Sequence, residues 1–359
     1  MLSDRVKFYV STKEFLAKYP FHSKARGYVA LADLSVEELA AWGDEVRVAE
    51  RRIVQALERG EEVGAVMHSD DPDEEIVSFP LAVMLAAAVG DKWLQRRLAL
   101  YESRRVEAFL SGEEDEVLEA VWTDLGLKAG RCGPDEVERT GFPYKIFVAD
   151  YLRLVKGIDG AEWRLVNRIL WKGWVYVTRR ELIRLIAEEV ESRILKRLED
   201  VKISKIPDPI KETVERIRGM LATRFARALP KAEGSRDETT WPPCMVALKN
   251  ALLSGSKVGH FGNFAFATFL LSSGYSVEEV VAFYSQRPDF NERIARYQVE
   301  HIAGLRGSRT KYSVPSCQTM KAHGLCVEEG RLCPKGIRSP RQFQSLLRRI
   351  RSGSATAGQ

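Results

Sequence analysis

The chain has 359 residues, of which 45% are hydrophobic and 29% charged, with a formal net charge of +5. This composition is typical of a globular protein long enough for two domains, and it excludes a disordered chain. No apolar run reaches the roughly 18 residues that cross a bilayer, and the first residues lack the order of a signal peptide. We therefore expect a cytoplasmic protein without membrane contact.

The first two hundred residues are predicted to be mostly helical. Helical patterns of apolar residues cover positions 35–60 and 81–112. The acidic stretch between them, residues 68–75, contains Pro72 and is predicted to be a loop. Its Asp71 and Asp73 have the spacing of a metal-binding pair for nucleotidyl transfer, but a flexible acidic loop favours solvated side chains instead.

One short strand is predicted at residues 173–177, where aromatic and β-branched residues alternate. Thr178 and Glu181 follow in the spacing of a capping box, so a helix is expected to begin there. The apolar residues of this helix lie on one face and predict contact with a core: Leu182, Ile183, Ile186, Val190, Ile194, Leu195 and Leu198.

The later part of the chain is predicted to form a linker, a second domain and a tail. Residues 206–240 contain prolines and polar residues around a single helix at about 210–229, which is typical of a linker after a domain at 1–205. A C-terminal domain is expected at 241–351, and the small polar residues 352–359 predict a disordered tail. The fold class is therefore mainly α, with a minor β element in the N-terminal domain.

Positive charge is concentrated at the C-terminal end. Residues 241–359 carry 16 Lys and Arg against 7 Asp and Glu, whereas the first 240 residues carry 39 against 43. Such asymmetry predicts that the C-terminal domain binds a polyanion and the N-terminal domain does not.

Three of the five cysteines, Cys317, Cys326 and Cys333, lie within seventeen residues. In a cytoplasmic chain of this size, they favour a metal or cluster site over a disulfide framework. The fourth ligand would be Cys132 or Cys244. Because Cys244 begins the basic domain, domain organisation favours it and leaves Cys132 as a half-buried structural thiol.

The four cysteines have wide gaps of 72, 8 and 6 residues. Structural zinc sites usually take pairs of cysteines from short turns, whereas a [4Fe–4S] cluster takes its four thiolates at separate corners. The spacing favours an iron–sulfur cluster, with zinc as the alternative and no metal as the third interpretation.

These residues carry a family resemblance. The C-terminal domain resembles the iron–sulfur domain of the large subunit of archaeal and eukaryotic DNA primase, through "WPPCMVAL", "VGHFGNFAFATFLLSSGYSVEEVVAFY", "YQVEHIAGLRGSRTKYSVPSC" and the closing cysteines. The N-terminal half resembles archaeal members in "GRCGPDE", "FVADYLRLVK" and "KGWVYVTRRELIRLIAEEV". The resemblance covers nearly the whole chain.

The resemblance implies a non-catalytic subunit that docks on a catalytic small subunit and helps it begin and extend RNA primers for DNA replication, in association with the nucleoid. It implies a [4Fe–4S] cluster on Cys244, Cys317, Cys326 and Cys333, and partners that include template DNA, the RNA primer and the initiating nucleotide triphosphate. The residues that the sequence and the resemblance together nominate for nucleic-acid contact are Lys257, His260, Tyr297, His301, Arg306, Arg309, Lys311 and Tyr312.

One residue departs from the family pattern. The histidine motif of the family reads His-x-x-Arg, but here Asn263 stands where the arginine would be. A phosphate contact at this position is therefore in doubt, unless a neighbour such as Lys257 supplies it.

Three aromatic residues, Trp171, Trp174 and Tyr176, surround the predicted strand. They are expected either to pack the core or to anchor the small subunit, since aromatic residues dominate interface hot spots. Two rival classes remain at this point: a stand-alone iron–sulfur nuclease or helicase, and a zinc-stabilised DNA-binding protein. The first would need a carboxylate site on a strand or a nucleotide-binding loop, and the sequence predicts neither.

Overall fold

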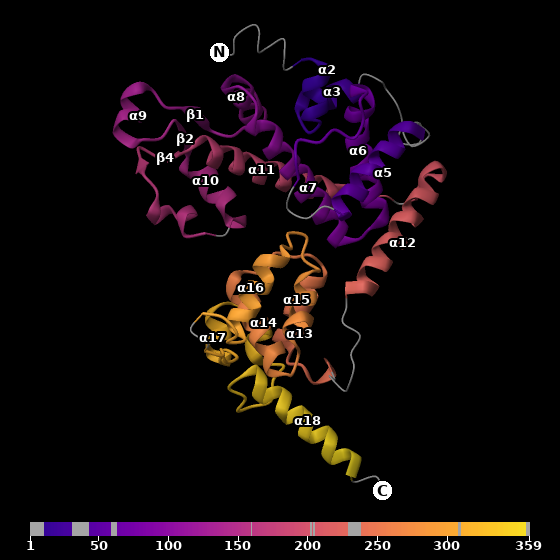
Figure 1. The fold of residues 1–359 in the computed structure, drawn as a ribbon, viewed down its shortest axis with the longest axis vertical. Coiled ribbons are helices and arrows are strands. Elements are labelled where there is room, and N and C mark those ends of the chain that lie inside the picture. The colour runs from indigo at the N-terminus through magenta and orange to yellow at the C-terminus, as the bar shows by residue number, and fades with distance from the viewer. Residues whose placement is uncertain are drawn as a thin grey trace. The chain divides into compact units, whose positions relative to one another are not determined.

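The computed structural model describes residues 11–30, 43–58, 63–158, 160–201, 203, 205–228, 238–307 and 310–356. The chain divides into two compact units, Met1–Gly219 and Met220–Gln359. Helices dominate both units, and the N-terminal unit also contains a small sheet (Figure 1), so the mainly α prediction with a minor β element is confirmed. No helix within the described ranges is long and apolar enough to span a membrane.

The N-terminal unit is built around α7 and α11, which run side by side (Figure 1). α5 packs against α6 in the same way. The described helices of this unit are α2 (Lys13–Lys18), α3 (Ser23–Ala30), α5 (Gly43–Glu58), α6 (Pro72–Val89), α7 (Lys92–Ser111), α8 (Asp115–Asp124), α9 (Pro134–Thr140), α10 (Val148–Leu154), α11 (Arg179–Asp200) and the first part of α12 (Lys211–Ala228).

An antiparallel sheet of four short strands lies in the N-terminal unit, in the order β1-β2-β4-β3. Its last strand in the chain is β4, which confirms the single strand predicted from the sequence. β1 and β3 have only three and two residues, too few to show alternation, whereas β2 is as long as β4 and alternates in burial but was not predicted. The strands are β1 (Ala129–Arg131), β2 (Tyr144–Phe147), β3 (Leu170–Trp171) and β4 (Trp174–Val177).

α11 begins as the sequence predicts. The Thr178 hydroxyl accepts from the backbone N–H of Glu181 at 3.2 Å, and the Glu181 carboxylate accepts from the backbone N–H of Thr178 at 2.8 Å. These bonds satisfy two N–H groups that the first helical turn leaves unpaired. Six of the seven apolar residues predicted to face the core are buried, and Leu195 is half-buried.

The second half of the predicted acidic loop, residues 72–75, is instead the start of α6. Asp71 is the N-cap and accepts from the backbone N–H of Asp73, while Pro72 occupies the first helical turn. Proline is tolerated there because the N–H that it lacks would have no intrahelical partner. Asp73 binds the Lys13 ammonium at 2.6 Å, and the Tyr28 hydroxyl donates to it. The prediction of a loop therefore holds for residues 68–71 and is wrong for residues 72–75, which are helical.

Glu75, from the first turn of α6, is the centre of a buried ionic network. Its Oε1 lies 2.6 Å from Arg52 Nη2, 3.1 Å from Arg105 Nη1 and 2.9 Å from His68 Nδ1. Glu102 pairs with both arginines, at 2.7 and 3.1 Å. Arg52 lowers the pKa of Glu75 to about 2, despite the opposing effect of burial. The network joins α5, α6 and α7 through buried ion pairs. Apolar side chains more commonly fill such a position between helices.

The segment expected to be a linker, residues 206–240, is partly packed on the N-terminal unit. Ile210, Val214 and Ile217 are buried, and the Arg216 guanidinium binds the Glu50 carboxylate of α5 at 2.8 Å. The first half of α12 and the 3₁₀ turn before it (Asp208–Ile210) are therefore part of a core, because their apolar residues at i, i+4 and i+7 form one stripe. Residues 229–237 of the expected linker lie outside the described residues.

The C-terminal unit is a cluster of helices around one apolar core. It contains α13 (Pro243–Leu253), α14 (His260–Ser272), α15 (Val277–Tyr284), α16 (Glu292–Ile302), α17 (Cys317–Ala322), a 3₁₀ helix (Val327–Gly330) and α18 (Pro340–Thr356). α18 continues through five of the eight residues expected as a disordered tail, and the last three lie outside the described range.

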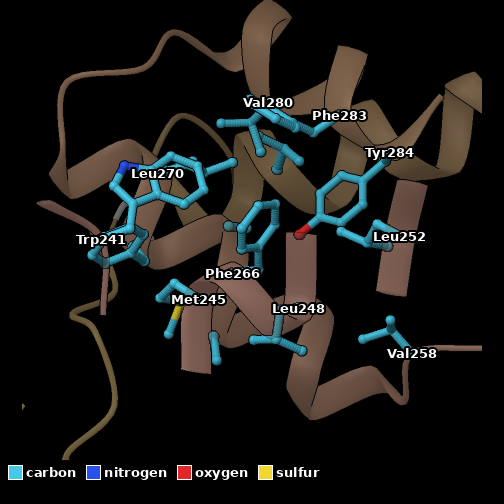
Figure 2. Packing of buried hydrophobic residues seen from close by; sticks show 14 of the residues in the cluster. Trp241, Met245, Leu248, Leu252, Val258, Phe266, Leu270, Val280, Phe283 and Tyr284 are labelled. Atoms are coloured by element: carbon cyan, nitrogen blue, oxygen red, sulfur yellow. The ribbon is translucent and has the colours of Figure 1, made fainter. Parts of the chain in front are cut away.

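Figure 2 shows the centre of this core, with Trp241 and Phe266 facing each other below Val280 and Phe283. The Trp241 ring meets Phe266 edge to face, with ring centroids 5.9 Å apart, and it meets Phe269 in the same way at 5.4 Å. The Tyr284 hydroxyl donates to the backbone carbonyl of Asn263 at 2.5 Å. The core therefore fixes the start of α14, on which the candidate site is built.

Candidate nucleic-acid interface and cysteine cluster

Four segments of the C-terminal unit supply its cysteines. Cys244 is in the first turn of α13, Cys317 begins α17, Cys326 immediately precedes the 3₁₀ helix, and Cys333 lies in the loop before α18. All four are half-buried free thiols. The backbone N–H of Cys317 donates to the Arg338 carbonyl at 2.8 Å, which joins α17 to the segment that carries Cys333.

The four thiols interact electrostatically. Burial raises the pKa of Cys244 to about 12, and Cys317, Cys333 and Cys326 add to the rise because a second thiolate nearby is unfavourable. Burial also raises the pKa of Cys317, with contributions from Cys333 and Cys326. The pKa of Cys132 is raised by burial and by Glu136, in the other unit. Of the two candidates for the fourth ligand, only Cys244 shares the surroundings of the other three.

A thiol with a raised pKa is protonated at neutral pH, and a bound metal centre removes that proton by its own positive charge. The chemistry of four neighbouring free thiols therefore fits a [4Fe–4S] cluster, whose irons take one thiolate each. Among the residues with described positions, no three His, Cys, Asp or Glu side chains are arranged to hold a single metal ion. The fit rests on the donor set and not on ligand geometry.

Gly262 brings α14 close to α13 and to the cysteine-bearing segment. A Cβ atom at this position would lie 2.7 Å from Val258 Cγ1, 3.3 Å from Leu248 Cδ2 and 3.8 Å from Leu325 Cδ2. Glycine is required here for space, because carbon atoms in contact normally lie 3.5–4.0 Å apart. The close approach sets Phe261, the preceding residue, against the segment that follows α17.

The Asn263 side chain has a structural role. Its side-chain Nδ2 donates to the Val258 carbonyl at 3.1 Å, and its own carbonyl accepts from the Tyr284 hydroxyl. The side chain therefore ties the loop before α14 to the helix. It does not offer a cation at the place where the family motif has one. Lys257 and His260, on either side of this loop, are exposed.

Six rings contact one another in a series that we call the aromatic row. His323 stacks on Phe261 with ring centroids 3.7 Å apart and planes 12° apart. Phe261 lies 6.0 Å from Phe264, and Phe264 meets Tyr312 edge to face at 5.6 Å. The full order of the row is His323, Phe261, Phe264, Tyr312, His301 and Tyr297.

The second half of the row contains the residues nominated from the sequence. His301 lies 5.7 Å from Tyr312 and 6.5 Å from Tyr297. The Arg306 guanidinium lies over the Tyr297 ring at 5.8 Å and also pairs with the Glu300 carboxylate. Arg306 is therefore partly neutralised, and its first role is to hold the loop against α16.

The loop after α16 depends on Gly307, which has a φ of +66°. A Cβ atom there would lie 2.8 Å from the His301 ring, in a backbone conformation that favours glycine. The backbone N–H of Tyr312 donates to the Ile302 carbonyl at 3.1 Å and returns the loop to α16. Lys311 is exposed next to it. Arg309, the other nominated cation, lies outside the described residues.

Three rings of the row, Phe261, Phe264 and His323, were not nominated from the sequence. Phe261 and Phe264 are half-buried in a helix that is otherwise so apolar that its sequence indicates only core packing. The available signal was their spacing of three residues next to an exposed histidine, which puts both on one helical face. Nothing in the sequence pairs His323 with Phe261.

The three aromatic residues nominated for partner binding differ in how far they are buried. Tyr176 is fully buried, and its hydroxyl donates to Glu136 at 3.1 Å, so it packs the core and offers no docking surface. Trp174 is half-buried and meets Phe147 edge to face. Trp171 is exposed, with the cationic groups of Arg139 and Lys172 over its ring at 4.3 and 4.4 Å.

Comparison with known proteins covers both units. A family model for the C-terminal domain of the eukaryotic and archaeal DNA primase large subunit matches residues 234–357, and the model for the N-terminal domain of the same subunit matches residues 17–206. The chain belongs to the DNA primase large-subunit family. The resemblance seen in the sequence is therefore confirmed, and the cysteine segments and the aromatic row both lie within the matched C-terminal domain.

The similarity to individual relatives extends over most of this chain and most of each relative. The DNA primase large subunit of Methanocella arvoryzae is 32% identical over 353 residues, covering 96% of this chain and 91% of the relative. That of Methanococcoides burtonii is 32% identical over 343 residues, with 92% and 91% covered. That of Halobacterium salinarum is 32% identical over 332 residues, with 88% and 89% covered. These archaeal relatives indicate a role in DNA primase for the whole chain.

Proposed function

We propose that the chain is the non-catalytic, regulatory subunit of a primase, which binds a catalytic small subunit through its N-terminal unit. Its C-terminal unit binds template DNA, the RNA primer and the initiating nucleotide triphosphate. The single observation that carries this proposal is the aromatic row, which occupies the same basic unit as the four interacting thiols.

The aromatic row suits unpaired nucleotides. Every base has a π face, so stacking on Tyr297 and Tyr312, both partly exposed, binds single strands without regard to sequence. Exposed cations such as Lys257 and Lys311 meet phosphates and fix the strand in register. This combination serves a subunit that must begin primers at many template sequences.

The four cysteines would hold the cluster, with one thiolate from each of four segments. When bound, the cluster supplies a covalent cross-link among segments that are far apart in the sequence, and metal binding of this kind contributes directly to folding. The chain's own residues then perform the recognition: His301 and Tyr312 bind the strand, and Gly307 lets the loop lie against His301.

The chain is proposed to bring no catalytic centre of its own. Asp71 and Asp73, whose spacing could suggest a metal pair, are used as a helix cap and as the partner of Lys13 and Tyr28. Bond formation is therefore assigned to the small subunit, with this chain positioning the template and the first nucleotide for it.

An exposed apolar surface on the N-terminal unit is the proposed docking surface for the small subunit. Val166 is 88% exposed, and its neighbours in the segment leading to β3 are also exposed although apolar. Such side chains are unfavourable in water and mark interaction sites. The docking surface consists of Leu152, Val166, Ile169, Leu170 and Trp171.

Co-purification with the small subunit tests this function. The double variant Val166→Asp with Leu170→Asp should weaken binding of the small subunit about 30-fold or more, since the loss of a hot-spot residue costs about 2 kcal/mol or more. It should still bind single-stranded DNA. Ile350→Asp is the control, because it makes the same change at an exposed apolar residue of the other unit.

Priming by the small subunit, measured with and without the chain, completes the test. Wild-type chain should raise the yield of initiated primers, and the double variant should not. A wild-type chain that neither binds the small subunit nor changes priming contradicts the proposed function. Normal binding by the double variant would instead mean that the docking surface lies elsewhere on the N-terminal unit.

A further inference from the structure

We infer that the Phe261–His323 pair is a stacking site for an unpaired template base, separate from the part of the row around His301 and Tyr312. This inference rests on the proposed function, because it assigns one subsite within the nucleic-acid interface. The two rings belong to different segments, the start of α14 and the residue that ends α17. Their planes are 12° apart at a centroid distance of 3.7 Å.

The pair has one buried side and one open side. Phe261 is half-buried and lies 6.0 Å from Phe264, whereas His323 is exposed. The imidazole is therefore the more exposed layer of the stack, and histidine is one of the rings on which unpaired bases stack. Among the described residues, no side-chain hydrogen bond or ion pair engages its ring nitrogens. They can donate to or accept from a base edge.

The local backbone presents His323 outward. The N–H of His323 donates to the Thr319 carbonyl, and the N–H of Leu325 donates to the Met320 carbonyl at 2.9 Å. Gly324 between them has a φ of +67°, the conformation that ends helices with this pattern of bonds. Leu325 packs against the apolar core and anchors the turn, whereas His323 is exposed.

The chemistry of the pair selects an unpaired base. Inside a duplex, both faces of a base are covered by its neighbours, so an outer ring such as His323 could not contact them. A single strand has exposed base faces and stacks readily on aromatic rings. The template ahead of the primer is the unpaired strand in a primase reaction, which makes it the occupant of the pair.

The test uses the full chain with its cluster and single-stranded DNA that contains one 2-aminopurine, a base whose fluorescence is quenched by stacking. Wild-type chain should quench the probe, and His323→Leu should abolish most of this quenching and weaken binding at least about fivefold. His323→Phe keeps the ring and should retain both. The salt dependence of binding should be the same in all three, because no phosphate contact is lost.

Lys311→Ala is the matched control for a phosphate contact. It should reduce the salt slope by roughly 0.7 to 1 while the bound probe remains quenched. Circular dichroism and the visible absorbance of the cluster check that each variant is folded.

The outcomes separate the inference from the proposed function. Suppose that the wild-type chain binds single strands and that the His323→Leu variant binds them and quenches the probe equally well. The pair is then only a packing contact, so the inference fails while the proposed function stands. Quenching of a fully duplex probe would also refute the choice of an unpaired base. If wild-type chain binds no single strand under any salt condition, the proposed function itself fails.

Discussion

Replacing Gly262 by alanine should destabilise the C-terminal unit, although the same change usually stabilises a helix. Alanine is favoured over glycine in a helix by up to about 1 kcal/mol. Here the added Cβ would lie 2.7 Å from Val258 Cγ1, about 1 Å closer than carbon atoms in contact, and 3.3 Å from Leu248 Cδ2. Overpacking of this kind costs about 1–3 kcal/mol.

The neighbours of Gly262 have little freedom to move. Val258 is buried and β-branched, so its side chain has few alternative rotamers, and Leu248 is buried in the same core. The net expectation is a loss of about 1 kcal/mol for α13 and α14. Gly219→Ala in α12 is the control, because a Cβ there would meet nothing within 4 Å. That substitution should stabilise its helix by about 0.5–1 kcal/mol.

Hydrogen exchange measures the two effects separately, because it reports local opening free energies for each peptide. Amides of α13 and α14 should exchange about fivefold faster in Gly262→Ala, and those of α12 should exchange more slowly in Gly219→Ala. Slower exchange of α14 in Gly262→Ala would refute the reasoning, since it would mean that helix propensity outweighs the packing conflict. The binding of single-stranded DNA should fall with the faster exchange, because Phe261 and the turn at Leu325 adjoin Gly262.

Two further predictions concern the cluster and the ionic network. Anaerobically purified chain should be brown, Cys326→Ser should remove the visible absorbance and Cys132→Ser should retain it; a colourless wild-type chain containing one zinc ion would contradict this. Glu75→Gln should destabilise the N-terminal unit by about 3–5 kcal/mol in urea unfolding, because it leaves buried guanidinium charge uncompensated. Since the pKa of Glu75 is lowered to about 2, its stabilisation should be complete above its ordinary 4.5 and should disappear as the pH falls toward 2. The pKa of buried His68 is also lowered, so stability should begin to fall below about pH 6.5, and an unfolding free energy that stays constant from pH 7 to 3 would contradict both assignments.

The sequence predicted those features that depend on local pattern or on residue type. The cap and apolar face of α11 could be predicted because each follows from residues within two or three turns. The strand β4 was recognisable, but its partners are only two to four residues long and depend on tertiary pairing. Pro72 was misinterpreted because proline begins a helix as readily as it breaks one. The signals for a helix start were present in the sequence, since Asp71 precedes Pro72 as a possible N-cap and acidic residues follow it.

The candidate site was predictable in its chemistry and not in its arrangement. The cysteines were nominated because their type and spacing indicate a cluster, and Tyr312 and His301 were nominated from residue type together with the family resemblance. The stack of Phe261 on His323 joins residues 62 positions apart, and neither residue has a pattern that identifies the other. Tyr176 was nominated as a possible contact because aromatic type indicates an interface or a core equally well, and only its burial decides for the core.

The proposed cysteine cluster and the proposed stacking site depend on the same short segments. α17 has six residues and the following 3₁₀ helix has four, so neither is stable by its own hydrogen bonds. Cys317 begins α17 and Cys326 lies three residues after His323. The proposed cross-link through these thiols would therefore fix both ends of the turn that carries the imidazole. Loss of the cross-link should release His323 from Phe261 and lower single-strand binding, while the N-terminal unit, with its own core and ionic network, continues to bind the small subunit.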